Sequence, residues 1–103
     1  MLQFPKPESR ATEKHLAGRA RLANRRLVYR LVSQRDRHLC RNCRAKGPGL
    51  HHHHLRFRSV GGQDTTANLL LLCGRCHADV HGYRMTIDGD TADGLLMFLR
   101  EQR

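Results

Sequence analysis

Bulky aromatic residues are scarce in this sequence, which has no Trp, two Tyr and three Phe among its 103 residues. A chain of this length predicts a single domain, and so small a domain buries only a modest share of its surface. Domains with little core usually depend on disulfides or a bound metal. Four cysteines could supply either, as two disulfides or as one metal site.

Long apolar runs are also missing. The first residues, MLQFPKPES, lack the apolar segment of a signal peptide, and the longest apolar runs are too short to span a bilayer. The sequence therefore predicts a cytoplasmic protein, and in that reducing compartment thiols favour metal binding over disulfides. No membrane partner is expected, because apolar and basic residues do not form a strongly membrane-seeking face.

Acidic residues are few in the first half of the chain. Residues 1–50 have 13 Lys and Arg against 3 Asp and Glu, whereas residues 51–103 have 6 of each sign. The whole excess of positive charge, +10, thus lies in the first half, and Arg, whose planar guanidinium suits phosphate oxygens, predominates. The sequence predicts a polyanionic partner; a merely solvated basic face is the alternative.

The N-terminal third predicts a mobile arm over residues 1–11, which contains two prolines, and then a basic helix from about Thr12 to Gln34 that opens a single domain over residues 12–103. Apolar residues recur there at helical spacing: Leu16, Ala20, Ala23, Leu27 and Leu31, with Val28 and Val32 beside them. Arginines occupy much of the remaining surface: Arg19, Arg21, Arg25, Arg26 and Arg30. The helix could pack over the core, place guanidinium groups along a DNA backbone, or do both.

The remaining segments predict short strands and one helix. LHHHHLRF (50–57) and NLLLLC (68–73) predict strands that flank a glycine-containing loop. CGRCHADVHG (73–82) predicts a helix that ends at Gly82. YRMTID and GLLMFLR, on either side of DGDTAD (88–93), predict a terminal β-hairpin, although LLMFLR could instead form a short helix.

The cysteines form two C-x2-C pairs, Cys40 with Cys43 and Cys73 with Cys76, separated by 29 residues. Two such pairs can present four thiolates tetrahedrally and leave no open position, which is typical of structural zinc. A redox role for one pair is the alternative, but it would leave the second pair unexplained.

Four consecutive histidines, His51 to His54, lie inside the chain, unlike a purification tag. His77 and His81 are four residues apart on the predicted helix, so both imidazoles emerge on one face and could bind one ion. A third ligand must come from elsewhere, and the histidine run is the obvious donor. In a strand, neighbouring histidines point to opposite sides, so one can bind metal while the next faces water.

A multi-part pattern links these motifs: Cys40-x2-Cys43, His53-His54, Gly61-Gly62, Asn68-Leu69, Cys73-x2-Cys76-His77 and His81. It resembles the HNH endonuclease family over residues 35–82, including the pair Arg35-Asp36 before the first cysteines. The resemblance implies an α+β protein with a small zinc-stapled ββα-metal fold. The N-terminal basic helix and the C-terminal β-hairpin lie outside the family core, as in small phage and prophage members.

The resemblance also implies roles for individual residues. Six residues separate the histidine pair from Gly-Gly in the family, which makes His54 the general base and His53 a metal ligand together with His77 and His81. In this register His51 and His52 are surface residues, supports for the ligands or accidental, and an earlier register of the run is the alternative. Asn68 either braces the loop next to the base or approaches the metal.

The activity implied by the resemblance is metal-dependent hydrolysis of double-stranded DNA, leaving 5′-phosphate and 3′-hydroxyl ends. We expect nicking with weak sequence preference by a monomer or weak dimer, with a structural Zn²⁺ and one catalytic Mn²⁺, Mg²⁺, Ni²⁺ or Zn²⁺. The expected phosphate contacts are Arg56, Arg58, Arg25, Arg26 and Arg30. Phage relatives suggest a bacterial cytoplasm and a terminase partner.

Two other classes compete with the nuclease. A noncatalytic zinc-stabilised DNA-binding module explains the charge and the cysteines, but it leaves the histidines and Asn68 without a role. A protein-interaction adaptor of zinc-ribbon type explains even less of the charge.

Overall fold

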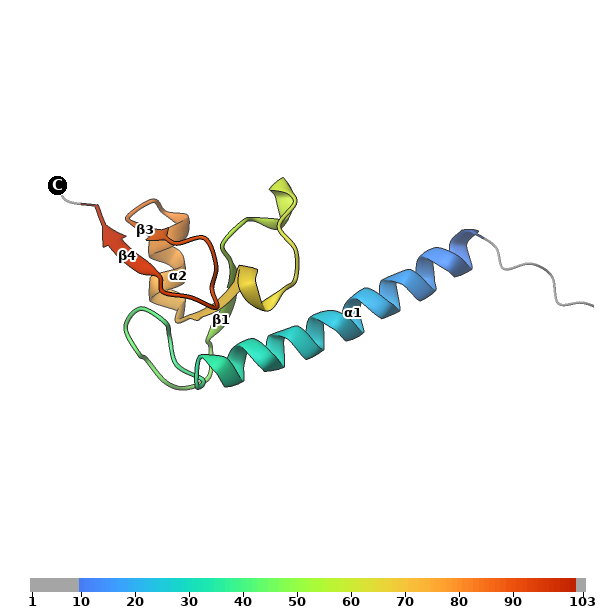
Figure 1. Ribbon diagram of the computed structural model, residues 1–103, viewed down its shortest axis with the longest axis horizontal. Coiled ribbons are helices and arrows are strands. Elements are labelled where there is room, and N and C mark those ends of the chain that lie inside the picture. The colour runs from blue at the N-terminus through green and yellow to red at the C-terminus, as the bar shows by residue number, and fades with distance from the viewer. Residues whose placement is uncertain (1–9, 102–103) are drawn as a thin grey trace, which may run out of the picture.

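The computed structural model describes residues 10–101, which form a long helix followed by a compact body (Figure 1). The elements in chain order are α1 (Arg10–Arg35), β1 (His51–His54), the 3₁₀ turns η1 (Arg58–Val60) and η2 (Thr66–Asn68), β2 (Leu69–Leu72), α2 (Gly74–His81), β3 (Met85–Asp88) and β4 (Met97–Arg100). Strands β1 and β2 followed by α2 make the ββα unit, so the expected α+β fold is confirmed. Of the expected arm, residues 1–9 lie outside the described residues, and the last two are helical. Neither described helix combines the length and apolar character needed to cross a bilayer.

Antiparallel strands β1 and β2 form the central sheet, in a register that runs from His51 opposite Leu72 to His54 opposite Leu69. All four leucines of β2 are buried. Leu69 and Leu71 pack towards α1, whereas Leu70 and Leu72 pack towards the cysteines and the C-terminal hairpin. Because directly opposed residues share a face of a sheet, His52 and His54 lie on the α1 side, and His51 and His53 lie on the other.

The packing of α1 differs from the expectation for its apolar stripe. Val28 and Val32 are buried against Leu69 and Leu71, whereas all five residues of the expected stripe, from Leu16 to Leu31, are exposed. Packing over the core, one of the two roles open to this helix, is therefore found for Val28 and Val32, and the other apolar residues of the stripe do not take part in it. On this side of the sheet β2 has two leucines, Leu69 and Leu71. They form a small apolar surface that contacts two valines, one turn apart, near the C-terminal end of α1. The N-terminal part of α1 projects away from the body (Figure 1).

The second cluster of buried residues lies on the opposite side of the sheet, where Cys40 and Cys76 pack with Leu70, Leu72 and Met85. Met85 comes from β3, which pairs with β4 from Met85 opposite Arg100 to Asp88 opposite Met97. The predicted C-terminal hairpin is thus confirmed, and the alternative of a helix over LLMFLR is wrong. The hairpin therefore covers the cysteine side of the ββα unit.

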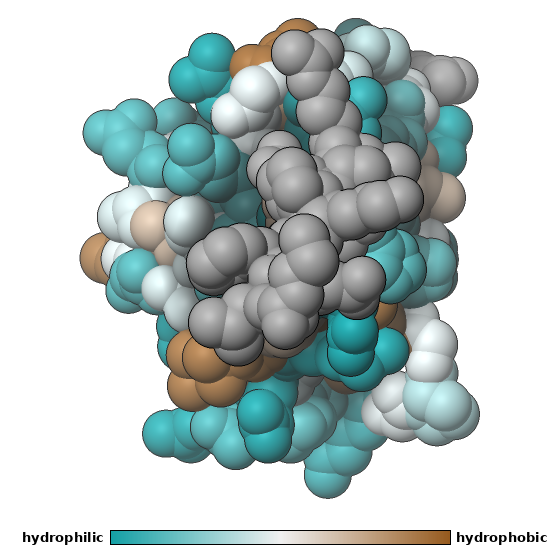
Figure 2. Space-filling model, turned by 90° about the vertical axis from the view of Figure 1, so that its right-hand side faces the viewer, coloured by the Kyte–Doolittle hydropathy of each residue, from teal (hydrophilic) through white to brown (hydrophobic). Residues whose placement is uncertain are grey.

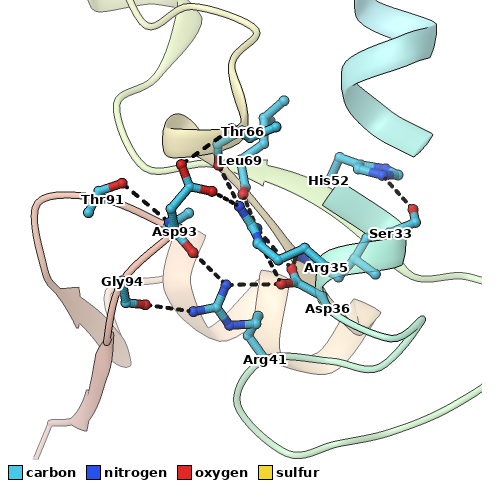
Figure 3. Close-up of polar contacts among 12 residues, drawn as sticks. Ser33, Arg35, Asp36, Arg41, His52, Thr66, Leu69, Thr91, Asp93 and Gly94 are labelled. Atoms are coloured by element: carbon cyan, nitrogen blue, oxygen red, sulfur yellow. Dashed lines mark hydrogen bonds and ion pairs between the residues drawn. The ribbon is translucent and has the colours of Figure 1, made fainter. Parts of the chain in front are cut away.

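A buried carboxylate joins the end of α1 to the body (Figure 3). The Asp36 side chain, 1% exposed, accepts hydrogen bonds from Arg35 Nε (2.8 Å), Arg41 Nη1 (3.0 Å) and the Leu71 backbone N–H (3.0 Å). Arg35 also donates to Asp93, at 2.9 Å, in the segment before β4. The pair Arg35-Asp36 therefore connects α1, β2 and the hairpin.

Replacing Asp36 by alanine is expected to lower the free energy of unfolding by about 3–5 kcal/mol, because the partly buried guanidinium groups of Arg35 and Arg41 and the buried Leu71 N–H lose the acceptor that they share. Urea unfolding followed by circular dichroism measures the change. Asp90→Ala, at an exposed position of the hairpin turn, is the matched control and should change the stability by less than about 0.5 kcal/mol. Equal stability of the two variants would contradict a stabilising role of this network.

Candidate active site

The four cysteines converge from the two C-x2-C turns. Their Sγ atoms lie within 4.8 Å of one another, and those of Cys43 and Cys73 are 3.6 Å apart. Two sulfurs on one tetrahedral zinc ion lie about 3.8 Å apart, whereas a disulfide needs about 2.05 Å. In each turn a backbone N–H points at a sulfur, from Cys43 to Cys40 Sγ and from Cys76 to Cys73 Sγ. The arrangement fits a tetrahedral thiolate site for a metal such as zinc.

Protonation of these thiols opposes metal binding to different degrees. Burial disfavours ionisation of Cys40, but backbone hydrogen bonds, led by that from Cys43, lower its pKa to about 7. Burial raises the pKa of Cys76 to about 12. A cation that binds all four sulfurs therefore displaces protons, so its affinity should rise with pH.

Three histidines form a second cluster. His53 of β1 and His77 and His81 of α2 each offer a ring nitrogen, and these atoms lie within 4.8 Å of one another. The Nε2 atoms of His77 and His81 are 2.9 Å apart, close to the separation of about 3.3 Å for two nitrogens on one tetrahedral ion. Burial and, secondarily, the nearby His77 and His81 lower the pKa of His53 to about 4. Burial likewise lowers the pKa of His77. Both imidazoles are thus neutral near pH 7, as metal ligands must be.

His54 lies on the other face of β1 and contacts a carboxylate. Its Nε2 is 2.8 Å from Asp64 Oδ1, and Asp64 Oδ2 accepts a hydrogen bond from Arg25 Nε of α1 at 3.3 Å. Burial disfavours ionisation of Asp64, but the hydrogen bonds from His54 and Arg25 outweigh it and lower the pKa. A neutral His54 therefore donates Nε2–H to Asp64 and keeps Nδ1 free to accept a proton. Sequence reasoning missed Asp64, whose only signal was its place two residues after Gly61-Gly62.

Side chains from both faces of β1 line one open cavity of about 400 Å³. It is lined by His52, His53, His54, Phe57, Arg58, Ser59, His77 and His81. The side chain of His54 is 12% exposed and contributes to the lining of this cavity. A molecule in the cavity can therefore meet the three-histidine cluster and His54 together.

Asn68 braces the loop that follows His54. Its Oδ1 accepts a hydrogen bond from the Arg56 N–H at 2.8 Å, and its Nδ2 donates to the carbonyl oxygens of Arg56 (3.1 Å) and Gln63 (2.9 Å). The same loop is closed by Gly62, where a Cβ atom would collide with the carbonyl oxygen of Arg56. Asn68 was expected either to brace this loop or to approach the metal. Its hydrogen bonds in the structure brace the loop, and its side chain is not part of the three-histidine cluster.

Residues 40–82 match the family model described as HNH endonuclease. Over this segment, which we term the HNH domain, the chain is similar to HNH endonucleases. The segment contains both clusters, His54, Asp64 and Asn68, and begins four residues after Asp36. No curated protein and no solved structure matches the chain. The match supports a nuclease-type function and a nucleic acid substrate in general.

The first two histidines of the run have distinct surroundings in the HNH domain. The His52 ring stacks on Tyr29 of α1 with centroids 4.1 Å apart, and its Nε2 lies 3.0 Å from the Tyr29 carbonyl oxygen and 3.1 Å from Ser33 Oγ. His52 therefore packs α1 against the sheet. His51 Nδ1 lies 3.1 Å from His77 Nδ1. Both His51 and His52 therefore make specific contacts with other residues of the structure.

The arginines predicted to contact phosphate are spread over the HNH domain and α1. Arg58 lines the cavity, whereas Arg56 is held within its own loop by a hydrogen bond to the Val60 carbonyl oxygen. Arg25 binds Asp64, and Arg26 and Arg30 are exposed on α1 outside the cavity lining. Viewed from the end where α1 projects, the surface is predominantly hydrophilic, with hydrophobic residues in small separate groups (Figure 2). The structure thus brings Arg58 and Arg25, of the five, next to the histidines.

Proposed function

We propose that this protein is a metal-dependent endonuclease that hydrolyses phosphodiester bonds of double-stranded DNA. The observation that carries the proposal is the convergence on one cavity of three histidine ligands and a fourth histidine, His54, that is bound to a carboxylate. A noncatalytic DNA-binding module would have no use for this combination.

Two groups of residues would bind metal. The four cysteines suit a structural Zn²⁺, and His53, His77 and His81 suit one catalytic divalent cation, Mn²⁺, Mg²⁺, Ni²⁺ or Zn²⁺. When bound, this cation supplies Lewis-acid stabilisation for the charge on the phosphate and on the leaving 3′ oxygen. Three protein ligands leave coordination positions for substrate, as a catalytic site requires.

His54 is the proposed general base. Its unprotonated Nδ1 takes a proton from a water molecule whose oxygen attacks the phosphorus in line with the 3′ oxygen. The P–O3′ bond breaks and the 3′ oxygen takes a proton from solvent, so that the products have 5′-phosphate and 3′-hydroxyl ends. Asp64 keeps the proton of the neutral ring on Nε2 and stabilises the imidazolium that forms. Arg58, at the wall of the cavity, is placed to bind a phosphate oxygen. Asn68 stabilises the conformation of the loop between β1 and β2.

The basic helix would bind the DNA backbone. Arg26 and Arg30 are exposed on α1, and guanidinium contacts to phosphates carry no sequence information. We therefore expect weak sequence preference, and nicking, because a single cavity cuts one strand. A monomeric or weakly dimeric state, a bacterial cytoplasmic location and a terminase partner belong to the proposal as well; of these, the bacterial host and the terminase rest on the family resemblance alone.

The test is the conversion of supercoiled plasmid to nicked circles by zinc-containing protein, with Mg²⁺, Mn²⁺, Ni²⁺ or Zn²⁺ added or withheld. We expect nicking that needs an added ion and is lost in the double variant His77→Ala, His81→Ala. His15→Ala, an exposed histidine on α1, is the matched control and should cleave like the wild type. If no added ion gives cleavage while DNA is still bound, the noncatalytic module is the correct alternative.

A further inference from the structure

His51 has no role in the mechanism above, although it begins the histidine run. It lies on the same face of β1 as His53, and its ring centroid is 4.7 Å from that of His77. The contact is polar, since the two Nδ1 atoms are 3.1 Å apart. His51 therefore contacts one of the three clustered histidines directly.

The two ring nitrogens of His77 have different partners. Nε2 faces His81 Nε2 at 2.9 Å, inside the cluster, whereas Nδ1 faces His51. A nitrogen that binds metal must be unprotonated, so a neutral His77 that binds through Nε2 has its proton on Nδ1. The group opposite must then accept a hydrogen bond, and Nδ1 of His51 is that acceptor.

The position of His51 also argues against its being a fourth ligand. It contacts His77 through the ring nitrogen that points away from the cluster, and His51 is not among the three residues whose nitrogens converge. Its backbone is fixed opposite Leu72 in the sheet, and its Nε2 lies next to Gly74 at the start of α2, 3.7 Å from where a Cβ would be. The same strand pairing thus sets the distance from His51 to α2.

We propose that His51 is a positioning residue for the catalytic cation. By accepting the Nδ1–H of His77, it fixes the tautomer and ring orientation in which Nε2 of His77 binds metal. The inference rests on the proposed function of the three-histidine cluster as the metal site. Partners of this kind typically contribute 10- to 100-fold in metal affinity. His77 is partly exposed, so water can replace some of the contact and the lower end applies.

The test is calorimetric titration of Co²⁺ or Mn²⁺ into full-length protein whose cysteine site contains zinc. His51→Ala should bind the added ion about 10-fold more weakly than the wild type. His51→Asn should recover much of the affinity, because its Oδ1 can accept a hydrogen bond close to the position of Nδ1. The matched control, His15→Ala, should bind like the wild type.

Two outcomes would overturn the proposal for His51 alone. One is wild-type affinity in His51→Ala; the other is an altered Co²⁺ absorption spectrum in His51→Ala without recovery in His51→Asn, which would make His51 a ligand. The proposed function fails differently: wild-type protein would then bind no ion beyond zinc, or would bind the ion at the histidines and still not cleave plasmid.

Discussion

Replacing His54 by alanine is expected to lower the rate of DNA cleavage by about 100- to 10,000-fold, the range that a positioned general base contributes. The substitution removes the proposed proton acceptor but leaves the three-histidine cluster on the other face of β1 unchanged. Affinity for DNA and for the catalytic cation should therefore persist. Single-turnover cleavage of supercoiled plasmid, fluorescence anisotropy with labelled duplex and thermal unfolding measure the three properties separately.

A companion substitution tests the partner of the base. Asp64→Asn keeps the shape of the side chain but removes the negative charge that stabilises the protonated imidazole of His54. We expect a smaller loss of rate than in His54→Ala, with unchanged affinity for the cation. Wild-type cleavage by His54→Ala would place the base elsewhere in the histidine run. Unfolding of His54→Ala would instead make the residue structural, and the assignment would have to be withdrawn.

The predictability of this site differs from residue to residue. Spacing predicted the cysteine cluster and the pair His77 and His81, because ligands four apart on a helix or three apart in a C-x2-C turn are brought together by local geometry. The family resemblance, not spacing, selected His53 from the histidine run. Alternation in β1 correctly separated His53 from His54. Asp64 could not be found in this way, since its approach to His54 depends on a loop shaped by Gly62 and Asn68, and no periodicity describes that path.

Helix α1 illustrates a second limit of sequence reasoning. The spacing predicted its existence and its basic character correctly, but it described one broad apolar stripe, from Leu16 to Leu31 with Val28 and Val32 beside it, and did not indicate which part contacts the core. The choice was made by the partner surface, because the sheet presents only Leu69 and Leu71 to the helix. His52 reinforces it by stacking on Tyr29, one residue from Val28. Tertiary contacts, not the pattern of the helix itself, thus decide its orientation.

Replacing Cys43 by serine is expected to unfold the HNH domain at ordinary temperatures. Structural zinc contributes about 10–16 kcal/mol in small zinc-binding peptides at pH 7, comparable to the total stability of a domain, about 5–15 kcal/mol. Cys43 is exposed, so the substitution removes a ligand with little loss of packing. Native mass spectrometry for bound zinc, together with circular dichroism during heating, measures the effect.

Two comparisons make this prediction specific to the metal. A chelator added to wild-type protein should reproduce the unfolding, and restored zinc should reverse it. Ser59→Ala, an exposed residue at the cavity, is the matched control and should leave the unfolding temperature unchanged. An unchanged unfolding temperature in Cys43→Ser, with its zinc absent, would show that the cysteines do not stabilise the fold.

The histidine site should depend on the cysteine site, whereas the cysteine site should not depend on the histidine site. Cys73, Cys76 and His77 lie within five residues at the start of α2, so loss of the cysteine site should release α2 and abolish cation binding at the histidines as well. The double variant His77→Ala, His81→Ala removes partly or largely exposed rings and leaves the cysteine cluster and both clusters of buried leucines intact. It should therefore lose cation binding and cleavage while it keeps zinc and unfolds near the wild-type temperature. Loss of zinc in that variant would mean that the two sites form one cooperative unit.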